Sequence, residues 1–67
     1  MTKEEVIEIL EKLQKTFQDK ENDCFTEMSF ARKHKMEMEE AAIHYRQEAY
    51  NDAWLTVWHE IDKLKNE

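Results

Sequence analysis

Three side chains with metal-binding chemistry recur at helical spacing in the second half of the sequence. Glu40, His44 and Glu48 are four residues apart, so a helix would place all three on one stripe, where adjacent turns can share a cation. The helical di-iron pattern needs a Glu three residues before a His, and none of the histidines has one. The spacing therefore favours ordinary Glu–His contacts on a solvated helix face, and we expect no metal site.

The single cysteine, Cys24, is a possible nucleophile without supporting groups. It has no Cys-x-x-Cys partner, and the chain has no glycine that would bring backbone amides close to an oxyanion. One cysteine also excludes an internal disulfide, and a lone thiol fits a reducing compartment. We expect no catalytic residue and no cofactor, and hence a protein that is not an enzyme.

A cluster of carboxylates resembles part of a known magnesium motif. Glu37 and Glu40 have the Glu-x-x-Glu spacing of the all-α nucleotide pyrophosphohydrolases of the MazG type, which hold magnesium between paired helices. The second half of that motif is Glu-x-x-Asp, whereas Glu48 and Asp52 are four residues apart here. What the resemblance implies, a small magnesium-dependent helical enzyme subunit, is kept as a second alternative function.

The only basic run lies near the middle of the chain and is followed by an arginine between two tyrosines. The first interpretation is that these cations pair with the acidic face of the first helix. The alternative is an oligomeric protein that sequesters a small anionic (cyclic) nucleotide, because Arg and Lys bind phosphates and an aromatic ring stacks on a base. The residues of this alternative site are Arg32, Lys33, Lys35, Tyr45, Arg46 and Tyr50.

Two further features predict a surface that binds a protein. The first helix carries an acidic face, and the second helix carries a Trp–Leu pair at the edge of its apolar stripe. Tryptophan is enriched at the energetic centres of interfaces, and charge steers association. The candidate partner-binding residues are Glu4, Glu8, Glu11, Leu55 and Trp58.

The elements that position all these residues are helices. The chain has neither Gly nor Pro and is rich in Glu, Lys, Ala, Met and Leu, which favours long helices. Thr2 and Glu5 form a capping box, and the apolar residues that follow repeat at 4-3-4 spacing up to Phe17. This pattern predicts a first helix over about residues 2–20.

A polar stretch, DKENDCFT, follows the first helix and predicts the turn, at about residues 20–26. Asn and Asp side chains bond to their own backbone in turns. Asp23, Thr26 or Ser29 would each cap the next helix, and the sequence does not choose among them. A second helix is then predicted over about residues 26–66.

The unequal lengths of these two helices predict self-association. At 1.5 Å per residue, the first would be about 27 Å long and the second about 60 Å. The unpaired half of the second helix would carry the best apolar seam, which a second copy would cover, unless the helix bends back at Asn51–Asp52. The oligomer interface would comprise Tyr50, Trp54, Val57, Ile61 and Leu64. The full predicted core adds Val6, Leu10, Leu13, Phe17, Met28, Met36 and Ile43.

Length and charge bound the class of protein. Sixty-seven residues allow a single domain, and the net charge of −6 argues against nucleic acid as a partner. No apolar run approaches the roughly 20 residues that span a bilayer, and the acidic start lacks the basic region of a signal peptide. We therefore expect a cytoplasmic protein.

As a whole, a short, acidic helical hairpin without Gly or Pro resembles the small accessory proteins of phages of low-GC Gram-positive bacteria, many of which inhibit host or defence proteins. The fold class predicted is all-α, an antiparallel two-helix hairpin with a long second helix that self-associates into a homodimer or larger helical bundle. The function predicted is a non-enzymatic protein-interaction module, an inhibitor or adaptor. The identity of its partner and the order of the oligomer stay open.

Overall fold

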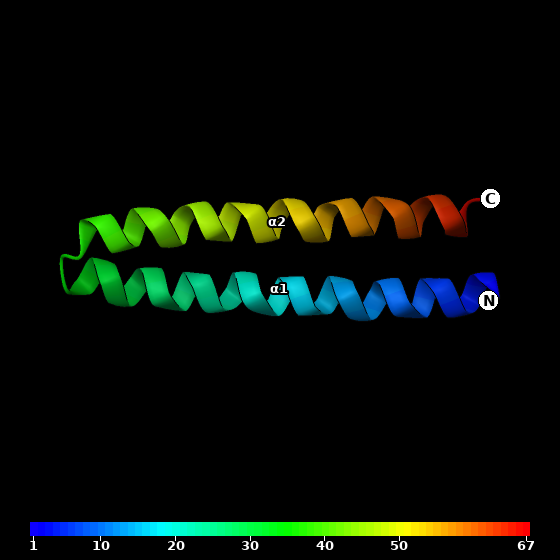
Figure 1. Cartoon of the computed structure of the whole chain (residues 1–67), viewed down its shortest axis with the longest axis horizontal. Coiled ribbons are helices and arrows are strands. Elements are labelled where there is room, and N and C mark those ends of the chain that lie inside the picture. Colours follow the sequence, from blue (N-terminus) through cyan, green and yellow to red (C-terminus); the bar gives the residue numbers. More distant parts are fainter.

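The computed structural model describes residues 1–67 as two long helices joined by a short connection. Helix α1 runs from Lys3 to Lys33 and α2 from Glu37 to Lys65, and the two lie antiparallel along their whole length (Figure 1). The chain ends meet at one end of the hairpin, where Lys3 Nζ is 3.4 Å from the backbone oxygen of Glu67. The predicted all-α antiparallel hairpin is confirmed.

The predicted helix boundaries are wrong. The stretch 20–26 is not a turn but the middle of α1, so the two helices have 31 and 29 residues and the second is not the longer one. The candidate caps fail for a physical reason: the hydroxyls of Thr26 and Ser29 donate to the backbone oxygens of Asn22 and Phe25, one turn back, inside a continuing helix. Only the predicted cap Thr2 is confirmed, since its Oγ1 accepts from the Glu5 amide.

The turn lies instead in the basic run, and it is built without glycine. Lys35 adopts a left-handed backbone with φ of 56°. Its amide donates to the Arg32 oxygen at 3.1 Å, and the Met36 amide donates to the Ala31 oxygen at 2.8 Å. This pair of bonds is the Schellman ending, in which a left-handed residue lets the chain leave the helix while the last carbonyls stay bonded.

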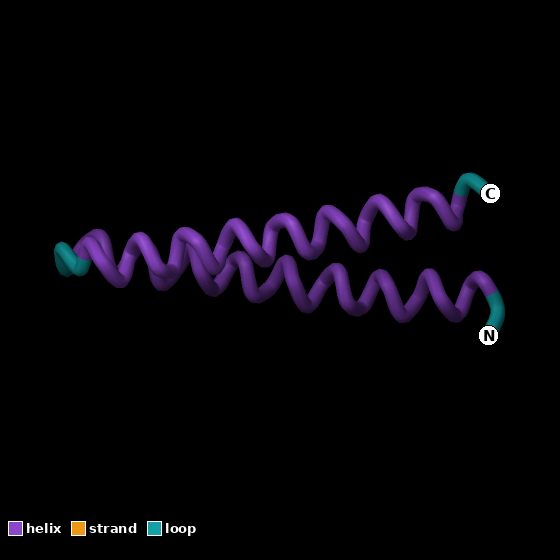
Figure 2. Tube along the Cα trace, turned by 45° about the horizontal axis from the view of Figure 1, so that its top comes forward, coloured by secondary structure: helices purple, strands orange, loops and turns teal.

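The seam between the helices has the spacing of a coiled coil. Along α1 the inward residues alternate steps of three and four, and so do those along α2. In the view of Figure 2 the two helices overlap near the connection and separate toward the chain ends, so they cross at an angle. The buried residues are Glu21, Cys24, Met28 and Ala31 from α1, and Ile43, Gln47, Val57 and Ile61 from α2.

The predicted core is correct in part. Met28, Ile43, Val57 and Ile61 are buried, and most of the other predicted residues are half-buried. Leu13 and Met36 are wrong, since they are 40% and 37% exposed. Because the chain turns at residues 34–36, the N-terminal half of α1 covers the C-terminal half of α2, which the sequence left unpaired.

The predicted oligomer interface is therefore corrected as well. Val57 and Ile61 are buried within a single chain, and Tyr50, Trp54 and Leu64 are half-buried along the same seam. These five residues pack between α1 and α2, so they are not free to bind a second copy while the hairpin is intact.

Neither helix is both long and apolar enough to cross a membrane.

Candidate functional site

A buried polar network fixes how the two helices lie against each other. The carboxylate of Glu21, in the middle of α1, accepts hydrogen bonds from Gln47 Nε2 and from Trp54 Nε1, the latter at 2.8 Å. Gln47 and Trp54 are two turns apart on α2, so Glu21 lies level with the turn between them, near Tyr50 and Asn51. No buried polar side-chain atom of the chain lacks a partner, so this network is satisfied within the hairpin.

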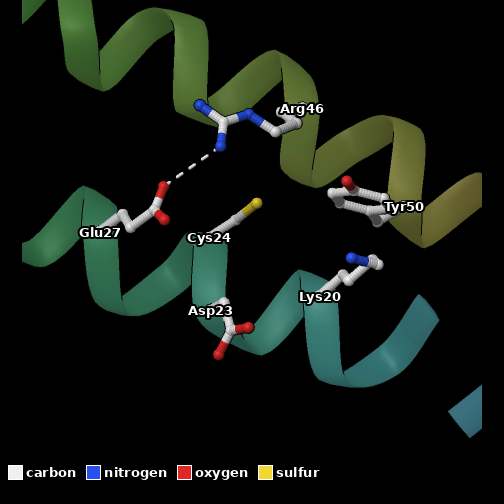
Figure 3. Close-up of a pocket in the computed structure, with 6 residues that line it drawn as sticks. All are labelled: Lys20, Asp23, Cys24, Glu27, Arg46 and Tyr50. Carbon is white, nitrogen blue, oxygen red and sulfur yellow. Dashed lines mark hydrogen bonds and ion pairs between the residues drawn. The ribbon is translucent and has the colours of Figure 1, made fainter. Parts of the chain in front are cut away.

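A small pocket opens beside this network, on one side of the seam. Its volume is about 140 Å³, and its lining includes two cations and two carboxylates. Figure 3 shows Cys24 pointing between the helices toward Arg46 and Tyr50, while Asp23 points away from α2. Arg46 Nη1 binds Glu27 Oε2 at 3.3 Å across the mouth. The lining residues are Lys20, Asp23, Cys24, Glu27, Arg46 and Tyr50.

Cys24 at the bottom of this pocket is a poor nucleophile. Burial raises the pKa of its thiol above the ordinary value of 9.0; the nearby Arg46 lowers it, and Glu27, Asp23 and Glu21 add to the rise. The thiolate is the reactive form of cysteine, so the thiol stays protonated near neutral pH. The pocket is a small gap in the packing between the helices, and the Glu27–Arg46 ion pair lies across its mouth. Its cysteine is not activated as a nucleophile.

The residues proposed for nucleotide binding do not converge. Arg46 and Tyr50 share the small pocket, but Arg46 is already neutralised by Glu27. Arg32 binds Glu40 at 2.8 Å, and Tyr45 lies 71% exposed on the outer side of α2. The remaining cations of that site, Lys33 and Lys35, lie at the exposed turn.

The stripe of Glu40, His44 and Glu48 also divides. His44 Nε2 lies 3.1 Å from Glu48 Oε1, whereas Glu40 turns toward Arg32. Glu40 is partly buried beside the seam. The sequence, by contrast, predicts that the whole stripe lies on the solvated face. No group of three His, Cys, Asp or Glu side chains is arranged to hold a metal ion.

The hairpin has two flanks, one on each side of the seam between the helices. The ion pair Glu27–Arg46 marks the first, which we call the ion-pair flank. Residues seven apart share a position in a coiled coil, so Leu13 and Lys20 lie on the same side as Glu27, and Ala53 lies on the same side as Arg46. Asp23 and Phe30 on α1 mark its outer edge, as does Ala49 on α2.

The opposite side, which we call the Trp58 flank, carries the predicted partner-binding residues. By the same heptad spacing, Glu4 and Glu11 occupy one edge position of α1, and Trp58 occupies the facing edge position of α2. Glu8 and Leu55 lie one step further out on their helices. The antiparallel pairing brings Glu11 and Trp58 to the same level, toward the end where the chain termini meet. Trp58 is 46% exposed.

An apolar groove indents the ion-pair flank near the turn. Its volume is about 360 Å³, and Phe30, Ala31, Met36 and Ile43 supply its apolar lining, with Thr26, Glu27 and Glu39 beside them. Phe30 is 59% exposed at its edge and stacks at 4.3 Å on His34. This groove was not predicted, because the sequence placed Phe30 and Ile43 on one continuous helix.

The polar network was also missed, although a signal for it exists. A seven-residue spacing continues the apolar seam straight through the stretch predicted as a turn, at Leu10, Phe17, Cys24 and Ala31.

Comparison with known proteins found no matching family model, no matching curated protein and no matching solved structure.

Proposed function

We propose that this chain is a cytoplasmic, non-enzymatic protein-interaction module, an inhibitor or adaptor, that binds its partner through the Trp58 flank. One observation carries the proposal: the hairpin brings the acidic residues of α1 and the exposed Trp58 of α2 to one end of one flank. These two features are far apart in the sequence, 47 residues at Glu11 and Trp58, and only an antiparallel pairing of full-length helices joins them.

The chemistry of this flank defines the partner. Glu4 and Glu11 pair with no cation, and the single ion pair of Glu8 is with Lys12 on its own helix at 3.6 Å, where both side chains are well exposed. Exposed carboxylates of this kind steer a basic surface toward them, and a tryptophan that buries its ring in a pocket supplies the affinity. The partner is expected to present Lys or Arg around an apolar pocket.

The test compares capture of a protein from the native host by immobilised chain variants. Trp58→Ala removes the anchor, and Glu11→Lys reverses the charge beside it, so both should weaken capture of the same protein by at least about tenfold. Raising the salt concentration should reduce capture by the unaltered chain, because exposed charges are screened beyond about 10 Å at 0.1 M.

Two matched variants serve as controls. Tyr45→Ala removes an aromatic ring that is more exposed than Trp58 but lies on the outer side of α2, and Asp52→Lys reverses an exposed charge on that same side. Both should leave capture unchanged. Equal loss with Trp58→Ala and Tyr45→Ala would contradict a binding site on the Trp58 flank.

Sequestration of a nucleotide is the second candidate, because Arg46 and Tyr50 do line one pocket together with Lys20 (Figure 3). A ligand that binds only the folded chain at 100 times its dissociation constant would add roughly 2.7 kcal/mol of stability. Linear and cyclic nucleotides should nevertheless give no melting shift, since Glu27 and Asp23 offset the two cations. A shift that Arg46→Ala abolishes would instead establish the second candidate.

A further inference from the structure

The hairpin exposes more surface than a compact chain of its mass. Its accessible area is 5222 Å², whereas a compact monomer of 8.2 kDa has about 4,500 Å² by the usual scaling of area with mass. The excess of roughly 700 Å² is close to the area of about 800 Å² that each partner buries in a standard interface. An interface of standard size would therefore bury about as much surface as this excess.

The ion-pair flank carries two apolar features, one toward each end. Toward the chain termini, Ile9 and Leu13 are 51% and 40% exposed. Toward the turn lies the apolar groove edged by Phe30. Ile9 and Phe30 are three heptads apart and so occupy the same position around α1. Lys20 lies midway between the Ile9–Leu13 pair and Phe30.

The small residues of α2 centre on the same level. Ala49 and Ala53 lie on the ion-pair flank with Asn51 midway between them, and the Glu21 network places that turn of α2 level with Glu21. Small side chains let two helix backbones approach closely. A two-fold axis that crosses the hairpin at this level would bring the Ile9–Leu13 pair of each copy against the apolar groove of the other.

We propose that a second copy of this chain docks antiparallel on the ion-pair flank, with Ile9 and Leu13 of each copy inserted into the groove beside Phe30 of the other. In this four-helix arrangement each α1 packs on the other copy's α1, and each α2 on the other α2. Ala49 lies against Ala53 of the other copy, and Lys20 lies close to the other Asp23. The interface is isologous and closed, as a two-fold dimer requires.

This dimer differs from the one that the sequence predicts, because it uses the outer flank and leaves the seam residues inside each hairpin. It also leaves the Trp58 flank free. Dimerisation and the proposed partner binding therefore use different flanks, and either can fail without the other.

The first test is the mass in solution by sedimentation equilibrium across the micromolar range. The unaltered chain should sediment as twice 8.2 kDa. Leu13→Glu and Phe30→Glu place charges at the two halves of the contact, so each should raise the dimer dissociation constant by at least about tenfold. Ile9 is more exposed than Leu13, so Ile9→Glu tests the same half of the contact with less risk of unfolding the chain. Circular dichroism should show that the variants keep their helix content. The control Tyr45→Glu should stay dimeric.

The second test fixes the orientation with a short bismaleimide in a Cys24→Ala background. Lys20→Cys lies next to the proposed axis and should give covalent dimers, whereas Asn22→Cys, which lies on the Trp58 side of α1, should not. Three results would each overturn the proposal: a stable 8.2 kDa monomer, a dimer that survives Ile9→Glu, Leu13→Glu and Phe30→Glu, or crosslinking through Asn22→Cys instead of Lys20→Cys.

Discussion

Trp54 donates its indole N–H to the carboxylate of Glu21 across the seam at 2.8 Å. The second carboxylate oxygen of Glu21 accepts from Gln47, so one acidic side chain holds two donors of the opposite helix. A slip of one helix along the other would separate all three groups and bury them unpaired, at a cost of about 1–3 kcal/mol for each unsatisfied group. The network therefore selects one register among the pairings that an apolar seam alone would allow.

Glu21→Ala should consequently lower the free energy of unfolding by about 2–3 kcal/mol, because it leaves two donors without an acceptor in the seam. Glu21→Gln keeps one acceptor oxygen and should cost less. Glu11→Ala, at an exposed position on the same helix, should change stability by about 0.5 kcal/mol or less. Urea denaturation measures all three variants. Equal effects of Glu21→Ala and Glu11→Ala would show that the network does not form.

Cys24 predicts a dependence of stability on pH. Burial raises the pKa of its thiol in the folded chain above the ordinary 9.0, so the folded chain holds this proton more tightly than the unfolded chain does. The resulting stabilisation is complete below pH 9.0 and is lost as the pH rises through the folded pKa. Cys24→Ala, which lacks this proton, should lose less stability than the unaltered chain between pH 8 and pH 10, as measured by urea denaturation. Parallel losses in the two proteins would contradict the assignment.

Lys35 predicts a stabilising substitution. A residue with a Cβ pays a steric cost in the left-handed region, which glycine does not. Lys35→Gly should therefore stabilise the hairpin by about 0.5–1 kcal/mol. Lys33→Gly, at the last residue of α1, should instead destabilise it by up to about 1 kcal/mol. Thermal unfolding of the pair distinguishes them, and destabilisation by both would place the turn elsewhere.

The sequence predicted the helical class and the inward positions of α2 well, because composition and the 4-3-4-3 spacing from Tyr50 to Leu64 are local signals. It predicts the turn in the wrong place, because the polar stretch at residues 20–26 has the composition of a break between helices. Asn22 and Asp23 are polar since they lie on the outer faces of α1, while Cys24 continues the seam one step away. The real turn carries no Gly, Asn or Pro, and Lys35 has no sequence signature for a left-handed backbone.

The misplaced turn also explains why the arrangement of the candidate site could not be predicted. Of the candidate partner-binding residues, Leu55 is half-buried and the others are exposed, but nothing local in the sequence indicates that Glu11 and Trp58 share a flank. Their proximity depends on where the chain turns, since moving the turn by ten residues shifts the pairing of every residue on α1. The apolar groove beside Phe30 depends on the turn in the same way, because Met36 lines it from the turn itself and Ile43 reaches it from α2.

Both flanks thus depend on the turn at residues 34–36, which one distance measurement tests directly. Spin labels at Lys3→Cys and Asn66→Cys, in a Cys24→Ala background diluted with excess unlabelled chain, report the separation of the chain ends within one molecule by pulsed electron resonance. Full-length helices place the labels side by side, at about 20 Å or less allowing for the two flexible linkers, as the Lys3–Glu67 contact indicates. A turn at 20–26 would set Lys3 against the middle of a longer second helix and give about 35 Å. That distance would contradict both the hairpin and the two binding surfaces proposed on its flanks.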